Sequence, residues 1–271
     1  SLVGSEMCIR DRLTPMQGFS AKFGPTDGAV ADTTDTGETS LLPAAGNAWT
    51  ITFWTKTQSA GASAGILQLQ PFPLNIRPVN SAGGQEGISV DLGGATKMTA
   101  NFPTATKNDW HHVALTFAGG QYRLYIDGTL ATLTTDIAIP SALNLNLGSR
   151  TSNPGTWAGR LDELRIYHFQ LDELDLGEVM EGTASSLTPG LKTYWKMDEE
   201  KGEKSFDLIK RNKLFFCGAK FDKDRPPVRT AGKTNEDGYY KIESASYGTG
   251  ITFLAEPMKN FYLHRALKFN R

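Results

Sequence analysis

The fold of this chain is decided by the stretch WHHVALTFAGGQYRLYIDG at residues 110–128. Apolar side chains alternate with smaller or polar ones over residues 113–117 and again over residues 122–126. A period of two indicates β-strands, because successive side chains of a strand point to opposite faces. The pairs Gly119-Gly120 and Asp127-Gly128 tolerate the positive φ angles that tight turns need. The stretch therefore predicts two consecutive β-hairpins.

The same pattern extends from about residue 19 to residue 168. Short runs rich in β-branched and aromatic residues, such as residues 50–54 and 143–147, are separated by Gly, Pro, Asn and Asp. No amphipathic helix lies between these runs, which favours two stacked antiparallel sheets. A length of 271 residues leaves room for one large sandwich and a smaller module. The predicted fold class is all-β.

Charge and composition exclude several classes of partner. The chain has 28 Lys and Arg against 29 Asp and Glu, so no overall positive field would attract nucleic acid or an anionic membrane. No apolar run reaches the roughly 18 residues of a membrane span. The two cysteines, Cys8 and Cys217, are too few and too far apart for a metal knuckle or a disulfide framework. We therefore expect neither nucleic-acid binding nor membrane insertion.

Five motifs in fixed order carry a family resemblance. They are similar to the laminin-G-like branch of the concanavalin A-like lectin/glucanase superfamily and fall at residues 48–54, 109–114, 122–128, 147–150 and 159–167. The resemblance implies a jelly-roll sandwich whose concave sheet meets glycans or proteins, often with a structural Ca²⁺ at one rim. It predicts a non-catalytic module for carbohydrate or protein recognition or adhesion, located outside the cell or on its surface. A purely structural spacer is the alternative without a ligand.

The chain is expected to have four parts. Residues 1–12 (SLVGSEMCIRDR) resemble a translated sequencing adapter, with a natural disordered start as the alternative. Residues 13–182 are assigned to the jelly roll and residues 183–228 to a connector, where the charge balance shifts from acidic to basic. Residues 229–271 resemble an incomplete transthyretin-like, carboxypeptidase-regulatory module, on the pattern Thr-x-x-x-Gly-x-Tyr at residues 234–240. The whole is expected to be a fragment of a large bacterial-type secreted protein.

A calcium site is predicted from three aspartates. Asp162 alternates in phase with Leu164 and Ile166, so its carboxylate is expected on the apolar side, where it needs a partner. The loop at 27–38 contains Asp27 and Asp32 and no basic residue, and its oxygen donors suit Ca²⁺. The resemblance implies that the two regions meet at the rim. Alternatively, Asp162 accepts hydrogen bonds from a turn and the loop is solvated.

Three acidic residues resemble a catalytic motif. Glu173, Asp175 and Glu178 follow the Glu-x-Asp-x-x-Glu order of glucanases in this superfamily, which place the three carboxylates on one strand. Here the apolar residues around them recur at helical spacing, which predicts a short helix. Three acids at these positions do not share one helical face. We therefore predict no catalytic residue and no enzyme, with a glucanase as the alternative.

Ligand contacts are predicted at one tryptophan and one strand face. Trp157 is expected in the loop at 152–157, and Tyr125 with Arg123 lies opposite the apolar face of its strand. An exposed aromatic ring beside polar donors suits a glycan, although such rings also fill sandwich cores. The lysines of the second half, from Lys201 to Lys223, are interleaved with acids and are expected to form a solvated surface.

Overall fold

The structure is a computed structural model of the chain. It describes residues 18–32, 40–60, 65–70, 74–80, 86–103, 108–136, 138–139, 144–148, 157–181, 189–227, 232–234, 240–243 and 250–253. Residues 18–226 form one compact unit, and residues 1–17 and 227–271 form a second. The predicted leader at 1–12 lies outside the described residues.

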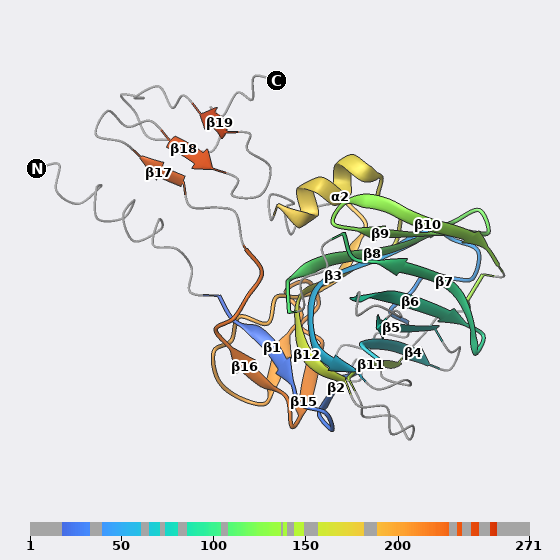
Figure 1. The fold of residues 1–271 in the computed structure, drawn as a ribbon, viewed down its shortest axis with the longest axis horizontal. Helices are drawn as coiled ribbons and strands as arrows, with labels where there is room; N and C mark the ends of the chain where they lie inside the picture. Colours follow the sequence, from blue (N-terminus) through green and yellow to red (C-terminus); the bar gives the residue numbers. More distant parts are fainter. Residues whose placement is uncertain are drawn as a thin grey trace, which may run out of the picture. The chain divides into compact units, whose positions relative to one another are not determined.

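Two antiparallel sheets build the unit at 18–226 (Figure 1). Sheet A has the order β10-β9-β8-β3-β12-β1-β16, with β13 also paired to β12. Sheet B has the order β14-β15-β2-β11-β4-β5-β6-β7. In sheet A the strands are β1 (Ser20–Phe23), β3 (Trp49–Ala60), β8 (His111–Ala118), β9 (Gln121–Ile126), β10 (Thr129–Thr135), β12 (Trp157–Tyr167), β13 (Leu191–Trp195) and β16 (Lys220–Asp222). In sheet B they are β2 (Gly28–Asp32), β4 (Leu67–Gln70), β5 (Leu74–Asn80), β6 (Glu86–Leu92), β7 (Ala95–Asn101), β11 (Asn144–Gly148), β14 (Lys204–Phe206) and β15 (Lys213–Cys217).

The predicted sandwich and its two hairpins are confirmed. β8 pairs with β9 and β9 pairs with β10, and the second turn holds Asp127 at φ 50° and Gly128 at φ 79°. The alternating apolar residues of β8 and β9 point into the shared core between the sheets, where Val113 and Leu124 are fully buried. Burial of the apolar side chains between the two sheets is the main driving force for stacking them.

Residues 189–226, called here the closing segment, correct the predicted connector at 183–228. Four of its stretches are strands of the sandwich: β13 and β16 join sheet A, and β14 and β15 join sheet B. Trp195 and Leu214 are fully buried in the common core. The jelly roll predicted at 13–182 is thus completed by residues beyond its expected end, because their apolar side chains fill the core next to β1 and β2.

A small separate sheet forms in the second unit. β17 (Gly232–Thr234), β18 (Tyr240–Glu243) and β19 (Gly250–Phe253) are antiparallel in the order β17-β18-β19. The transthyretin-like nature of residues 229–271 stays a prediction.

Candidate functional site

A short helix covers one end of the outer face of sheet A. Helix α2 (Glu173–Met180) begins at Asp172, whose side chain accepts a hydrogen bond from the Asp175 N–H at 2.9 Å. The Asp175 carboxylate accepts in return from the Asp172 N–H at 3.2 Å, which closes a capping box. Leu176 and Val179 are buried against Ala114 of β8 and Tyr125 of β9. Figure 1 shows α2 lying beside β9 and β10. Across the described residues no helix is long and apolar enough to cross a bilayer.

This helix confirms the predicted conformation of the acidic motif. All three acids lie in the helix α2 and not along one strand. Glu173 and Glu178 are exposed, while Asp175 is engaged in the capping box. At about 100° per residue Glu173 lies away from Asp175 and Glu178, so the three carboxylates do not line one face, and the Asp175 carboxylate accepts from the Asp172 N–H in the capping box.

A pocket of about 370 Å³ lies where α2 begins. Two of the predicted contact residues, Arg123 and Tyr125, come from β9, and the other walls come from the chain that leads into the helix. The complete lining is Arg123, Tyr125, Gln170, Leu171, Asp172, Glu173 and Leu174. A volume of this size is within the range of small-ligand sites.

The pocket combines donors and acceptors of hydrogen bonds. Burial raises the pKa of Tyr125, and the charges of Glu173 and Asp172 raise it further, while Arg123 opposes them through its charge and a hydrogen bond. The phenol is therefore neutral at physiological pH. The Gln170 amide donates to Thr116 Oγ1 at 3.2 Å, which fixes the amide on the wall. The pocket thus holds a guanidinium, an amide, a phenol and two carboxylates within one small space.

Trp157 does not join this site, which corrects its predicted role as an exposed platform. It is the first residue of β12 and is completely buried. Its indole packs 5.2 Å from the ring of Phe23, centroid to centroid, and Nε1 donates to Thr57 Oγ1 at 3.3 Å. The strand begins at Trp157 itself, so the alternation of β12 directs this ring into the core.

Asp162 lies on the opposite face from the one predicted. A β-bulge at Glu163, with φ 54°, shifts the register of β12 against β3 between Asp162 and Arg165. One extra residue reverses the side-chain phase, so Leu164 points into the core and Asp162 to the outer face opposite Trp54. Asp162 is nevertheless only 2% exposed and accepts from the Glu163 N–H at 2.9 Å. Burial raises its pKa well above the usual value, and the charges of Glu163 and Asp198 add to the rise.

The three aspartates predicted to share Ca²⁺ are dispersed. Asp27 closes a turn by accepting from the Gly24 N–H at 2.7 Å, Asp32 pairs with Lys213 in sheet B, and Asp162 belongs to sheet A. Across the part of the chain that the structure describes, no group of three or more His, Cys, Asp or Glu side chains is placed to hold a metal. The three do not fit a common ion. Residues 33–39 of the predicted loop lie outside the described residues, and Ca²⁺ binding stays a prediction.

Sequence reasoning did not assign five of the seven pocket residues to ligand binding, although Glu173 was considered as part of the glucanase-like motif. The position of Asp172 at the start of the helix could have been predicted, since Asp-x-x-Asp before an apolar helical run is a capping pattern. No such pattern marks Gln170 and Leu174, because their place beside β9 depends on how the helix packs on the sheet. The strand face of Arg123 and Tyr125 was predicted correctly from alternation alone.

Comparison with known proteins identifies the family. A laminin-G sequence family described as the concanavalin A-like lectin/glucanases superfamily matches residues 27–176. The chain belongs to this superfamily. The matched range ends inside α2, so the closing segment of this concanavalin A-like domain lies beyond it.

Solved structures agree on the fold of this superfamily member. A candidate carbohydrate binding protein of Bacteroides ovatus superposes with a TM-score of 0.58 at 16% identity, over 79% of this chain and 62% of that one. A heptameric SAP-like pentraxin of Limulus polyphemus gives 0.52 at 12% identity, over 77% of this chain and 96% of the pentraxin. These likenesses show the fold alone.

One curated relative is a far larger protein. The Sushi, von Willebrand factor type A, EGF and pentraxin domain-containing protein 1 of Rattus norvegicus is 27% identical over 117 residues. The matching segment is 38% of this chain and 3% of that protein.

Proposed function

We propose that the concanavalin A-like domain is a non-catalytic recognition module that binds an uncharged sugar in the pocket at the start of α2. The observation that carries the proposal is the meeting of Arg123, Gln170 and the acids of the helix start in one cavity. A sugar hydroxyl both donates and accepts, and the guanidinium supplies only donors while a carboxylate supplies only acceptors. Neighbouring hydroxyls can therefore be satisfied by the two kinds of group together.

Two further points support an uncharged ligand. Asp172 and Glu173 outnumber Arg123, so an acidic sugar would meet repulsion at the rim. The carbohydrate-binding description of the Bacteroides ovatus protein agrees with this class of ligand, although it was given to that protein. The extracellular or cell-surface location and the absence of catalysis belong to the same proposal.

A protein ligand is the second candidate, favoured by apolar side chains around the pocket. Leu174 on its wall is 63% exposed. On β10, Leu130 pairs with Tyr125 and Leu133 with Arg123, so both leucines lie on the same face as the pocket, and they are 36% and 49% exposed. Exposed apolar surface next to a pocket is typical of protein contacts.

The test is a neutral-glycan array probed with the full chain and with Arg123→Ala. We expect at least one neutral glycan to bind, and R123A to weaken that binding at least tenfold, because the donor to the sugar hydroxyls is lost. The matched control is Arg77→Ala, whose side chain pairs with Asp91 on sheet B. Equal loss in both variants, or binding that persists in R123A, contradicts the proposal.

A further inference from the structure

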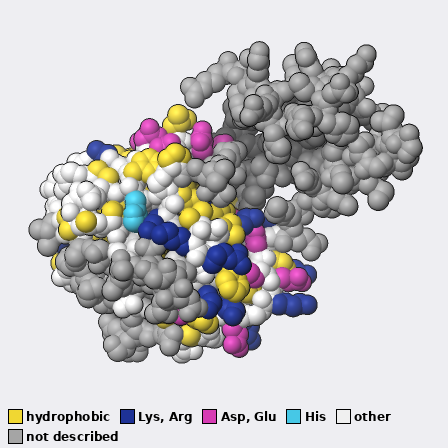
Figure 2. Space-filling model, turned by 180° about the vertical axis from the view of Figure 1, so that it is seen from behind, with side chains coloured by type: hydrophobic (Ala, Val, Ile, Leu, Met, Phe, Trp, Pro, Cys, Tyr) yellow, Lys and Arg dark blue, Asp and Glu magenta, His cyan; other side chains and the backbone are white. Residues whose placement is uncertain are grey.

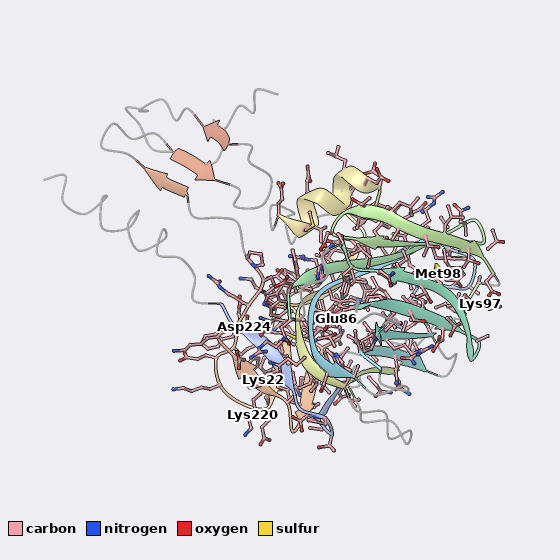
Figure 3. The ribbon with its side chains drawn as sticks, viewed as in Figure 1. Lys22, Glu86, Lys97, Met98, Lys220 and Asp224 are labelled. Carbon is pink, nitrogen blue, oxygen red and sulfur yellow. The ribbon has the colours of Figure 1, made fainter. Side chains whose placement is uncertain are left out.

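A row of four basic side chains crosses the other end of the outer face of sheet A. Lys220 of β16 pairs with Lys22 of β1, Lys22 pairs with Arg160 of β12, and Arg160 pairs with Lys56 of β3. Directly opposite residues of antiparallel strands point to the same side, and neighbouring strands are about 4.8 Å apart. The four cations therefore form one line across four strands, called here the basic row. Figure 3 shows Lys22 and Lys220 side by side, with Asp224 near them.

The row has more positive charge than the protein neutralises. Asp222 contacts Lys22 at 3.7 Å and Arg160 at 3.3 Å, and Asp224 contacts Lys56 at 2.9 Å and Arg160 at 3.4 Å. Two carboxylates thus pair with three of the four cations. Lys220 is exposed and has no ion pair among the described residues, and the Lys22 side chain is 47% exposed. Like charges directly opposite each other destabilise a sheet, so folding alone does not favour this arrangement.

Both carboxylates are ionised and remain bound to the row. Partial burial would raise the pKa of Asp222, but the Asp224 N–H, Arg160 and Lys22 lower it below the usual value. Burial likewise opposes the lowering of the Asp224 pKa by Trp110, Lys56 and Arg160. The two negative charges at the row are therefore present at physiological pH. Figure 2 shows Lys and Arg gathered on this side of the molecule, with acids between them.

Two details point to a ligand at the row. Arg160 is 7% exposed, and its Nη1 is buried without a hydrogen-bond partner within the described residues. A buried guanidinium N–H normally has an acceptor. Trp110 is held next to the row because its Nε1 donates to Asp224 at 2.9 Å, and its indole is partly exposed. An indole beside a line of cations can stack on the apolar face of a sugar ring while the cations bind its acidic groups.

We propose that the basic row binds a linear acidic polysaccharide, which carries carboxylate or sulfate groups along its length. A line of cations across strands matches a repeating anion better than a single one. The chain as a whole has net charge −1, so attraction of a polyanion would have to come from the basic row itself. This site is separate from the α2 pocket, whose acids would repel the same ligand.

The experiment measures binding of the full chain to dextran sulfate at low salt, with uncharged dextran as the matched ligand. The variant K22E/K220E is compared with K201E/K204E, which makes the same change of charge at exposed lysines at or near β14, on the edge of sheet B. We expect dextran sulfate, but not dextran, to bind the unmodified chain. We expect K22E/K220E to lose at least tenfold in affinity and K201E/K204E to stay within threefold. Higher salt should weaken binding, because exposed charges are screened.

Several results would overturn the proposal. They are no binding of dextran sulfate, equal losses in the two double variants, or a single-stranded oligonucleotide of matched charge that binds as tightly as dextran sulfate. Because both mutated lysines are exposed, melting temperatures within a few degrees confirm that each variant folds. R123A should leave dextran sulfate binding unchanged. The proposal for the basic row and the proposal for the pocket can therefore fail separately.

Discussion

The two ends of the outer face of sheet A are covered in different ways. At the β9–β10 end the cover is α2, which follows β12 almost directly in the chain. At the β1–β16 end the cover is the last part of the closing segment, where Asp224 binds Lys56 and Trp110 more than 100 residues away in sequence. The first end has a pocket with an excess of acids, and the second has the basic row with an excess of cations. A domain of one family thus offers two surfaces of opposite character on a single sheet.

The folded unit is longer than the stretch that matches the superfamily: the unit spans residues 18–226, and the match spans residues 27–176. The matched residues 27–176 contain the α2 end, whereas β1 and the closing segment that form the other end lie outside the match. The predictions below test whether the closing segment belongs to the sandwich as fully as α2 does.

The largest effect is expected from Trp195→Ala. Trp195 in β13 is completely buried in the common core, so its loss leaves a large cavity. We expect the free energy of unfolding to fall by about 3–5 kcal/mol. Urea unfolding followed by fluorescence measures it. Leu208→Ala is the control in the same segment, since Leu208 is 47% exposed and should cost less than about 1 kcal/mol. If the two variants lose the same amount, the closing segment is not part of the core.

Asp162→Asn should change how stability depends on pH. The folded state raises the pKa of Asp162, through burial first and then through Glu163 and Asp198. The contribution of Asp162 is therefore fully present below the unfolded pKa, near 4, and is lost as the pH rises through the folded pKa. We expect the stability of D162N relative to the parent to increase between pH 4 and pH 8. Urea unfolding at both pH values measures it, and an unchanged difference would contradict the burial of a carboxylate behind the bulge.

Asp172→Ala tests the α2 end. It removes the side chain that caps the helix at Asp175 N–H, and the expected loss of unfolding free energy is about 1 kcal/mol. Glu178→Ala, at an exposed position of the same helix, should change stability by less than about 0.5 kcal/mol. Thermal unfolding of both variants and of the parent measures these changes in stability. A loss in E178A as large as that in D172A would argue against the capping role.

The smallest effect is expected from Asp222→Asn in the basic row. Hydrogen bonds from the Asp224 N–H and Arg160 lower the pKa of Asp222 despite partial burial. Its contribution is present above the unfolded pKa, near 4, and is lost as the pH falls through the folded pKa. We expect D222N to cost less than about 1 kcal/mol at pH 7 and almost nothing near pH 2, the reverse of the D162N trend. Titration of stability by urea unfolding across this range shows the sign.

Features set by neighbours in sequence could be predicted. The hairpins of residues 110–128, the helix at the acidic motif and the strand face of Arg123 and Tyr125 follow from spacing and turn residues alone. Each depends on contacts within a few residues, so periodicity contains the necessary information.

Features set by distant partners could not be predicted. The face of Asp162 was wrong because a single bulge residue, Glu163, reverses the alternation, and nothing in the local sequence marks it. The connector was wrong because the strands at 191–222 pair with β1, β2 and β12 rather than with each other alone. The basic row was missed for the same reason, since Lys22, Arg160 and Lys220 meet only after three strands from separate parts of the chain are aligned.

The pairing of β1 with β16 also determines how the domain would respond to a pulling force. The two strands are antiparallel, with Ser20 opposite Asp222, so the chain enters and leaves the sandwich at the same end of this pair. Tension applied between residues 18 and 226 would load the hydrogen bonds of the pair one after another, as in opening a zipper. Mechanical failure would therefore begin at this edge and expose Arg160 and its neighbours while the opposite end of the sheet, under α2, is still intact.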